Sequence, residues 1–448
     1  MIRTTLLSAS LVALSACTTL GPKTDPVSHG ITLPAAYDHA GTTAEERQDE
    51  QAWWADFGSE ALDGLVAEAL STNQTLAGGI ANVDAARAAL KVSNASLLPQ
   101  ASGSVSASSD TESGLDDVSS SARLSASYQL DLFGANAAAL EASRASLEAT
   151  EFAQRTLELT VQSDVASTYF SLLAAREQLR VAEQNLEISE RIFKIVEVKY
   201  AAGAISGYDV SSQRAQLANS RARIPELESQ ITGLETSLAI LLGRTPQGYE
   251  APDEKILDIA LPAAGSGLPS DLLLRRPDLR QAEASLRASN ANVTAARAAF
   301  FPSIDLGAGV SSLLSGGSNL TGSLSASLAQ TIFSGGRLEG QLEGAKARRE
   351  AQLASYREAI LNALRDVDVS LTSIEANARR QEQLLIARDA SLEALDAAEL
   401  RYRSGTDDLT SLLSAQQSYF TASDNYVQGR LSQLTAALNL YVALGGNY

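Results

Sequence analysis

The side chains that most often carry enzyme or metal chemistry are scarce in this sequence. Its 448 residues include one cysteine, Cys17, and two histidines, His29 and His39. A single cysteine cannot build a disulfide scaffold, and a zinc site made of Cys and His clusters is excluded in practice. No nucleophile paired with a histidine and no phosphate-binding glycine loop is recognisable. The sequence therefore predicts no catalytic residue, no metal site and no cofactor.

Carboxylates are the abundant chemical group. Asp and Glu number 53 against 35 Lys and Arg, which gives a formal net charge of −18 and a pI near 4.7. Many of them lie close together, but on helices with a seven-residue repeat such charges usually form a solvated face and not an acid–base pair. The acidic balance also argues against nucleic acid as a partner, because phosphates require a basic face. An enzyme is the least favoured class.

Cys17 stands where a cysteine can be lipidated. A basic start at Arg3 precedes an apolar run over residues 6–14, which is too short for a transmembrane helix of about 20 apolar residues. The sequence Leu14-Ser15-Ala16-Cys17 resembles a bacterial lipobox, whose cysteine becomes the lipidated first residue. We predict a lipoprotein signal peptide over 1–16 and a palmitate-bearing anchor at Cys17. An ordinary secretory signal with an incidental cysteine is the alternative.

An internal repeat organises the rest of the chain. Four landmarks recur at offsets of 200 to 203 residues: Leu98-Pro99 and Phe301-Pro302, Phe133-Gly134 and Phe333-Ser334, Tyr200-x-x-Gly203 and Tyr402-x-x-Gly405, and Leu242-Gly243 and Leu444-Gly445. The predicted organisation is a signal peptide (1–16), a lipidated linker (17–50), a first repeat (51–246) that begins with an equatorial segment, an equatorial linker (247–276) and a second repeat (277–448). Hairpins are predicted over 100–133 and 303–333, long helices over 135–200 and 336–403, and the following helices over 208–243 and 409–444.

The predicted hairpins alternate apolar and polar residues with a period of two. One face is apolar and the other carries Ser, Gly, Asp or Gln, over residues 102–108, 123–132, 303–311 and 320–332. A half-buried sheet in a soluble domain shows the same alternation. However, each strand is about 10 residues long, the length that crosses a bilayer when tilted. Four strands cannot close a barrel, and two copies would give eight strands with a filled interior. Three copies would give 3 × 4 = 12 strands around a pore.

The predicted helices are too long for a globular core. The first long helix would span roughly 100 Å at ~1.5 Å per residue. Apolar residues recur every seven positions before and after its turn: Val165, Leu172, Leu179, Leu186, Phe193 and Tyr200, then Val210, Leu217, Ile224, Ile231 and Leu238. Such repeats indicate coiled-coil packing. The predicted fold class is mixed α and β, with a coiled-coil helical barrel and a transmembrane β-barrel that closes as a homotrimer.

Several motifs together resemble the outer membrane factor family of the TolC/OprM type, in its lipid-anchored NodT group. They are Trp53-Trp54-x-x-Phe57, Leu130-Asp131-Leu132-Phe133-Gly134, Leu241-Leu242-Gly243 with Pro246, and Arg275-Arg276-Pro277-Asp278-Leu279-Arg280. The resemblance covers residues 14–445 and implies a homotrimer that contacts outer-membrane lipid and extends through the periplasm. It further implies an exit duct for a tripartite efflux system, with a periplasmic adaptor and an inner-membrane pump of the resistance–nodulation–division type.

Two other functions stay open at this stage. A type I protein secretion duct shares the fold, although lipidation and the Arg275-Arg276-Pro277-Asp278 motif resemble the drug-efflux branch more closely. A non-conducting coiled-coil spacer between envelope layers fits the heptads and Cys17, but it does not explain the amphipathic hairpins.

The resemblance places function at the two turns between helices, where the family closes its tunnel and meets the adaptor. Tyr200, Gly203, Tyr402 and Gly405 are the expected turn and adaptor-contact residues. Asp209, Asp407 and Asp408 would form acidic rings in a trimer, with helix capping as the competing interpretation. The expected gate also includes Thr410, Ser411, Ser414 and Gln417. Since Ser411, Ser414 and Gln417 are neutral where relatives often carry charge, we predict a weaker closure, held by hydrogen bonds and an apolar constriction, with residual charge from Asp407 and Asp408.

Overall fold

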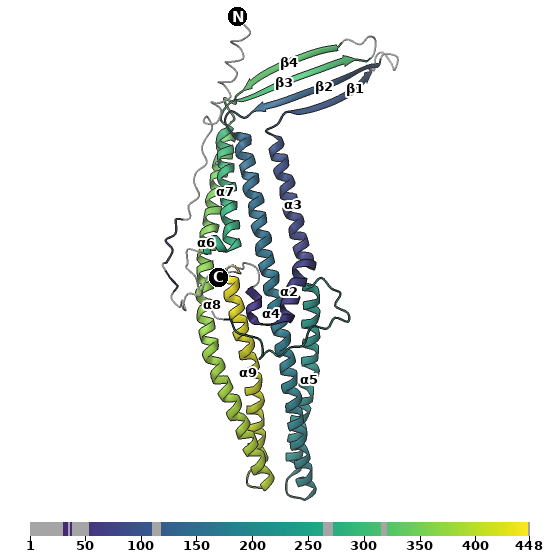
Figure 1. Cartoon of the computed structure of the whole chain (residues 1–448), viewed down its shortest axis with the longest axis vertical. Coiled ribbons are helices and arrows are strands. Elements are labelled where there is room, and N and C mark those ends of the chain that lie inside the picture. The colour runs from purple at the N-terminus through teal and green to yellow at the C-terminus, as the bar shows by residue number, and fades with distance from the viewer. Residues whose placement is uncertain are drawn as a thin grey trace. The chain divides into compact units, whose positions relative to one another are not determined.

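The computed structural model describes residues 30–34, 36–37, 53–109, 118–262, 272–314 and 320–446. Cys17 and the predicted signal peptide lie outside these residues. In chain order the elements are η1 (Trp53–Phe57), α2 (Glu60–Thr72), α3 (Gln74–Ala95), β1 (Gln100–Ser109), β2 (Val118–Leu130), α4 (Ala135–Ala201), α5 (Gly207–Leu241), α6 (Leu272–Arg275), α7 (Pro277–Ala298), β3 (Ser303–Leu313), β4 (Leu320–Ala329), α8 (Arg337–Ser404) and α9 (Leu409–Ala443) (Figure 1). Among the described helices, none combines the length and the hydropathy that a membrane span requires.

The chain divides into two compact units, and neither coincides with one of the predicted repeats. The described part of unit 1 lies mainly in Gly79–Gln154 and Asp278–Ile360. Unit 2 contains Arg155–Pro277, the second half of α8 and all of α9, together with η1 and α2. Each unit therefore takes elements from both halves of the sequence.

The sheet of unit 1 is antiparallel throughout, with the strand order β1-β2-β3-β4 (Figure 1). Leu124 in β2 pairs with Gly103 in β1 and with Val310 in β3. Leu324 in β4 pairs with Ala308. The strands β1 and β4 each have only one neighbour in the sheet, so both carry a row of backbone groups that could pair with another chain.

The two faces of this sheet have opposite chemistry. Large side chains on one face are strongly exposed, and Leu324 reaches 89% exposure. On the other face, serine hydroxyls pair across β1 and β2 at 2.9–3.0 Å: Ser102 with Ser125, Ser106 with Ser121, and Ser108 with Ser119. The described strands carry two charged residues, Arg123 and Asp305, and the register places both on this hydroxyl face.

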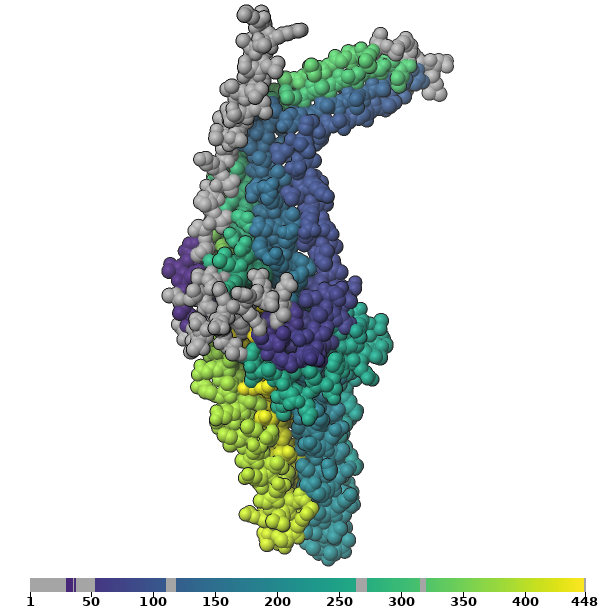
Figure 2. All heavy atoms as spheres, viewed as in Figure 1, coloured from purple at the N-terminus to yellow at the C-terminus, as the bar shows by residue number. Residues whose placement is uncertain are grey.

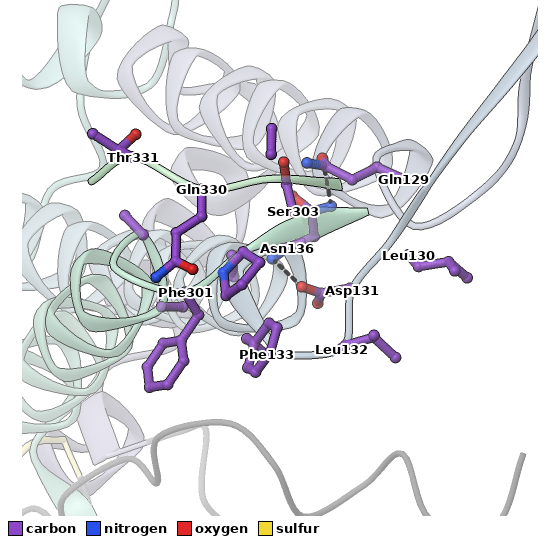
Figure 3. Close-up of a pocket in the computed structure, with 15 residues that line it drawn as sticks. Gln129, Leu130, Asp131, Leu132, Phe133, Asn136, Phe301, Ser303, Gln330 and Thr331 are labelled. Carbon is purple, nitrogen blue, oxygen red and sulfur yellow. Dashed lines mark hydrogen bonds between the residues drawn. The ribbon is translucent and has the colours of Figure 1, made fainter. Parts of the chain in front are cut away.

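The base of the sheet is anchored to α4 by side-chain capping. Asp131 accepts hydrogen bonds from the backbone N–H groups of Asn136 (3.1 Å) and Ala137 (2.7 Å), which lack partners within the helix. The Asn136 amide donates to Gln129 Oε1 at 3.3 Å. Gln129, Asp131 and Asn136 line a cavity of about 360 Å³. Phe133 and Phe301 also line it, and their rings stack with centroids 4.9 Å apart (Figure 3). The cavity therefore belongs to the strand-to-helix junction.

The largest core of unit 2 is aromatic. The rings of Trp53 and Tyr441 stack with centroids 5.3 Å apart, and those of Phe57 and Phe170 lie 5.0 Å apart. All four side chains are buried, together with leucines of α2, α4, α5 and α9. The Trp53-Trp54-x-x-Phe57 motif thus joins η1 to α4 and α9.

The C-terminal ends of α5 and α9 are capped by similar contacts. The Asn73 amide donates to Leu241 O at 2.8 Å, and Arg276 Nη1 donates to Ala443 O at 3.1 Å. Arg276 also lies 3.6 Å from Asp366. Gly243 and Gly445 follow these helix ends with φ of +67° and +87°. Arg276, from the most recognisable sequence motif, therefore caps a helix end.

Substituting Gly243 by alanine should destabilise unit 2 strongly. An added Cβ would lie within 3.0 Å of the Thr72 carbonyl oxygen, and the positive φ would add strain of about 1–2 kcal/mol. Gly248 is the matched control, because its φ is +75° but a Cβ would meet nothing within 4 Å. Thermal unfolding of the purified protein should show a larger loss for Gly243→Ala than for Gly248→Ala. Equal losses would contradict the close packing at Thr72.

Candidate functional site

The two turns between helices have the same backbone pattern. Gly203 follows α4 with φ of +72°, and Gly405 follows α8 with φ of +78°. The N–H of Ala204 donates to Lys199 O at 2.9 Å, and that of Thr406 donates to Arg401 O at 3.0 Å. A hydrogen bond from the residue after a glycine to the carbonyl five positions earlier ends a helix and reverses the chain.

The three aspartates at these turns bind backbone groups next to them. Asp209 Oδ2 accepts from the N–H of Ser206 (2.9 Å) and from its hydroxyl (2.8 Å). Asp408 accepts from the N–H of Ser411 at 2.8 Å, and Asp407 accepts from the N–H of Asp408 at 2.9 Å. The hydrogen bond from Ser411 holds the pKa of Asp408 below its ordinary value. Each carboxylate therefore stabilises a turn or a helix start within its own protomer.

The two tyrosines at equivalent positions of the turn pattern, Tyr200 and Tyr402, have different environments. Tyr402 is buried, while Tyr200 is exposed. The Lys199 ammonium lies 4.1 Å from the Tyr402 ring centroid and also donates to the Tyr402 carbonyl oxygen. Burial and the nearby charge of Asp209 raise the pKa of Tyr402. Tyr402 thus joins the two turns, whereas the aromatic ring of Tyr200 is exposed to solvent.

A cluster of three charged side chains links the helical hairpin α4–α5 to the helical hairpin α8–α9. Glu399 of α8 accepts from Arg191 of α4 at Nε (3.1 Å) and Nη2 (2.9 Å). Arg403 lies 2.7 Å from the same carboxylate. Glu399 is only 7% exposed, and its hydrogen bonds raise the pKa of Arg191. Figure 2 shows α8 and α9, in green to yellow, directly against α4 and α5 at this end of unit 2. We call Arg191, Glu399 and Arg403 the charge clamp.

Sequence reasoning did not identify the charge clamp. It treated the acidic residues of the long helices as a solvated face. One signal was available, because Glu399 stands between Leu395 and Tyr402 with the 4–3 spacing of a buried seam. A charged residue at such a position needs a partner, since an isolated buried charge is costly.

The expected gate residues of α9 lie along a neutral groove. Thr410, Ser414 and Gln417 line it together with Leu384 and Leu413, and its volume is about 730 Å³. Its lining contains no charged side chain. Ser411 is exposed and contacts Asp408 through its N–H. The structure therefore brings Thr410, Ser414 and Gln417 to one surface, while the ionic contacts between hairpins lie at the charge clamp.

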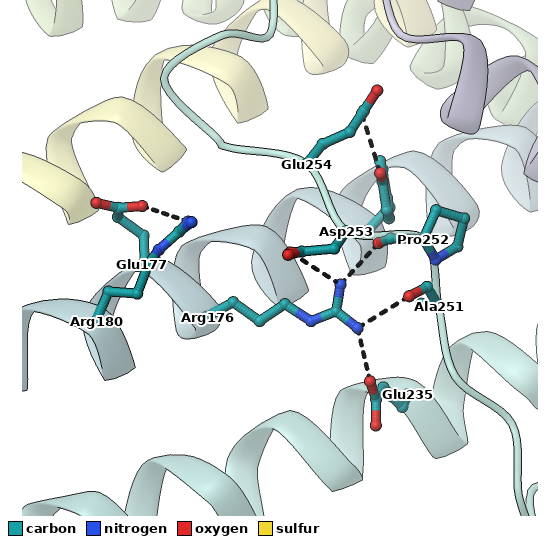
Figure 4. Close-up of polar contacts among 9 residues, drawn as sticks. Arg176, Glu177, Arg180, Glu235, Ala251, Pro252, Asp253 and Glu254 are labelled. Carbon is teal, nitrogen blue, oxygen red and sulfur yellow. Dashed lines mark hydrogen bonds and ion pairs between the residues drawn. The ribbon is translucent and has the colours of Figure 1, made fainter. Parts of the chain in front are cut away.

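A second polar cluster holds residues 251–259, which we call the strap, against the helices. Arg176 of α4 donates to Pro252 O (2.7 Å), Ala251 O (3.0 Å) and Glu235 of α5 (2.7 Å) (Figure 4). Arg430 of α9 donates to the carbonyl oxygens of Ile256 and Ile259. The strap is thus bonded to both hairpins by guanidinium groups from α4 and α9.

Replacing Arg176 by lysine should loosen the strap. An ammonium cannot reproduce the planar fork that reaches two carbonyl oxygens and Glu235 together, so we expect a loss of about 2 kcal/mol. Hydrogen–deuterium exchange should become faster over residues 249–256. Arg144→Lys is the control, because Arg144 makes an exposed pair with Glu141 at 2.8 Å. Unchanged exchange in Arg176→Lys would contradict this role.

No group of three or more His, Cys, Asp or Glu side chains is placed to hold a metal ion within the described ranges. The polar groups at the turns, the charge clamp and the strap are arranged to join helices. The sheet adds an exposed apolar face and a hydroxyl face.

Comparison with known proteins identifies the class. The model of the family described as outer membrane efflux protein matches residues 65–244 and 268–446. The pyoverdine export outer membrane protein OpmQ of Pseudomonas aeruginosa is 36% identical, over 99% of this chain and 96% of that protein. The cation efflux system protein CusC of Escherichia coli is 31% identical, over 90% of both chains. The chain belongs to the outer membrane efflux protein family.

Solved structures agree with this assignment. The outer-membrane channel OprN covers 96% of this chain with a TM-score of 0.83 and 29% identity, and 99% of that chain is matched. The open state of the outer-membrane channel MtrE of Neisseria gonorrhoeae covers 95%, with a TM-score of 0.84 and 28% identity, and 98% of that chain is matched. The predictions of an outer-membrane location and an efflux function are confirmed.

Proposed function

We propose that the protein is a lipid-anchored homotrimer that forms the passive exit duct of a tripartite efflux system. The observation that carries this proposal is the four-stranded sheet with two unpaired edges and an exposed apolar face. Unpaired strand edges are not tolerated in lipid, so the sheet must close with strands from other copies. Three copies supply twelve strands, with the apolar face toward lipid and the hydroxyl face toward a water-filled lumen.

The proposed duct is built from a tandem duplication. Supporting this, α3 and α7 each have 22 residues, α4 and α8 have 67 and 68, and α5 and α9 have 35 each. The family model also matches one stretch in each half of the chain. The paired helix ends at Gly243 and Gly445 support the same interpretation. The predicted boundaries, 51–246 and 277–448, delimit the two copies in this proposal.

The partners in this proposal are a periplasmic adaptor and an inner-membrane pump of the resistance–nodulation–division type. The turns with Tyr200, Gly203, Tyr402 and Gly405 would form the periplasmic end and meet the adaptor. Relatives of similar identity are named for chemically different cargo, such as pyoverdine for OpmQ and cations for CusC. This variety supports selection of the substrate by the pump. The duct itself performs no covalent chemistry in this account.

Gel electrophoresis and lipid labelling test the assembly and the anchor. The unheated protein should run as a trimer, and metabolic palmitate label should enter it at Cys17. Cys17→Ser should lose the label, while Ser15→Thr, two residues away, should retain it. A monomer under all mild detergent conditions would contradict the trimer, and labelled Cys17→Ser would contradict the anchor.

A further inference from the structure

Charged side chains are nearly absent from the four described strands of unit 1. The strands β1 and β4 contain none, β2 contains Arg123, and β3 contains Asp305. These two charges are opposite in sign, so the acidic excess of the chain lies outside the described strands. The register places Arg123 on the hydroxyl face, between Ser104 of β1 and Ser311 of β3. A basic group therefore stands alone among hydroxyls.

Arg123 has no counter-charge near it in the described strands. Its side chain is exposed, and no described residue forms a hydrogen bond or an ion pair with it. Arg123 lies opposite Ser311, so Asp305 is six positions away along β3, about 20 Å at ~3.4 Å per residue. This separation exceeds the Debye length of about 8 Å at physiological salt. The five N–H donors of the guanidinium are therefore available to a ligand.

One row of the hydroxyl face crosses all four strands at Arg123. Arg123 pairs with Ser104 and with Ser311, and Ser311 pairs with Thr321. We call Ser104, Arg123, Ser311 and Thr321 the Arg123 row. Side chains directly opposite each other in an antiparallel sheet have Cβ atoms about 4.5–5.5 Å apart. An oxyanion held by the guanidinium is thus within reach of hydroxyl groups on both neighbouring strands.

The Arg123 row interrupts a ladder of paired hydroxyls. On β1 and β2, the serines on either side of the row bond to each other at 2.9–3.0 Å: Ser102 with Ser125, and Ser106 with Ser121. Ser104 lies between these pairs and opposite Arg123, and no described residue is a hydrogen-bond partner of its hydroxyl. The row therefore combines a positive charge with a hydroxyl donor that the sheet itself does not use.

We propose that the Arg123 row is an oxyanion-binding site in the lumen of the barrel, which the acidic groups of exported organic molecules contact as they leave. The guanidinium fork matches a carboxylate or sulfonate, and the flanking hydroxyls add neutral donors. Three copies of the row surround one lumen in a trimer, and rings of arginine favour anions. The acidic excess outside the strands still gives the whole duct its cation preference. This inference rests on the proposed function, because the lumen exists only in the closed barrel.

Arg123→Gln tests the proposal, and Asp305→Asn is its matched control, because each removes one charge from the hydroxyl face of the sheet. The probe is a trisulfonated pyrene dye, and fluorescence anisotropy at low salt measures its binding to the detergent-extracted protein. We expect saturable binding to the unmodified trimer and at least fivefold weaker binding to Arg123→Gln. Arg123→Lys should bind with intermediate strength, since it keeps the charge without the planar fork. Asp305→Asn should bind the dye at least as tightly as the unmodified protein.

Ion selectivity provides a second readout in bilayers. The ratio of K⁺ to Cl⁻ permeability, measured from reversal potentials in a KCl gradient, should rise at least twofold in Arg123→Gln. The same ratio should fall in Asp305→Asn, because the remaining lumen charge of the strands is then positive. An unchanged ratio in conducting Arg123→Gln trimers would overturn the proposal.

The dye measurement separates this inference from the proposed function, because it needs no conduction. Equal dye binding by the unmodified and Arg123→Gln trimers would overturn the Arg123 row as a site, and so would a lack of saturable binding to the unmodified trimer. A trimer that binds the dye through Arg123 but never conducts would support the site and count against the duct. A protein that stays monomeric would overturn both, since no lumen would form.

Discussion

Glu399→Ala is expected to raise the open probability of the channel roughly tenfold or more. The Glu399 carboxylate is buried and receives two hydrogen bonds from Arg191 and one ion pair from Arg403. Its removal takes away the carboxylate that joins the two guanidinium groups, and only the charges of Glu187 and Asp396 still act on Arg191. Charge-assisted hydrogen bonds contribute about 2 kcal/mol in partly exposed settings, and 1.4 kcal/mol corresponds to a tenfold change in an equilibrium. Single-channel recording of the purified protein measures the change.

The control for this prediction is Glu393→Ala, six residues earlier on the exposed side of α8. It removes the same charge from the same helix without touching the charge clamp, so its open probability should match that of the unmodified protein. Equal behaviour of Glu399→Ala and Glu393→Ala would contradict the clamp. High salt should reduce the difference only in part, because Glu399 is shielded from solvent.

Leu324→Arg is expected to prevent assembly in the outer membrane. Leu324 is central in β4 and lies on the exposed apolar face, which contacts lipid in the proposed barrel. An arginine on a lipid-facing strand costs about 2–4 kcal/mol near the midplane of the bilayer, and a trimer would carry three. The amount of heat-resistant trimer in outer-membrane fractions should therefore fall below detection.

The neighbouring residue provides a strict control. Ser323 precedes Leu324 in the same strand, and its side chain points to the hydroxyl face, where its Oγ lies 3.4 Å from Gly309 O. Ser323→Arg should assemble normally and make the channel less permeable to cations. A similar loss of trimer in both variants would contradict the assignment of the apolar face to lipid and of the hydroxyl face to water.

The sequence allowed the main elements to be predicted because their patterns are local. The period-two alternation identified the strands, and Gly203 and Gly405 identified the turns. Both glycines have positive φ values, which explains why glycine stands at these positions. The strand limits were less accurate. We expected alternation to continue to residues 132 and 332, whereas β2 ends at Leu130 and β4 at Ala329. Asp131 leaves the strand to cap α4, which is a side-chain role that alternation does not reveal.

The contacts between distant segments could not be predicted from the sequence. Arg191 and Glu399 are 208 residues apart, and Arg176 and Pro252 are 76 apart, so no local pattern connects them. The prediction that buried residues of α4 recur strictly every seven positions was also inaccurate near the turns. Tyr200, its last member, is 52% exposed, while Ser189 and Ile192 are fully buried. A straight helix drifts by about 20° per heptad, which moves the buried line away from a strict seven-residue spacing.

Planar-bilayer conductance of the detergent-extracted protein, with its mass measured by light scattering on the same sample, tests the central claim most directly. If the protein is a passive duct, we expect a trimeric mass and a conductance that prefers cations. Glu399→Ala should increase this conductance when the unmodified channel is largely closed. A monomer that never inserts would contradict both the closed sheet and the duct. Trimers that do not conduct even as Glu399→Ala would contradict conduction while leaving the assembly intact.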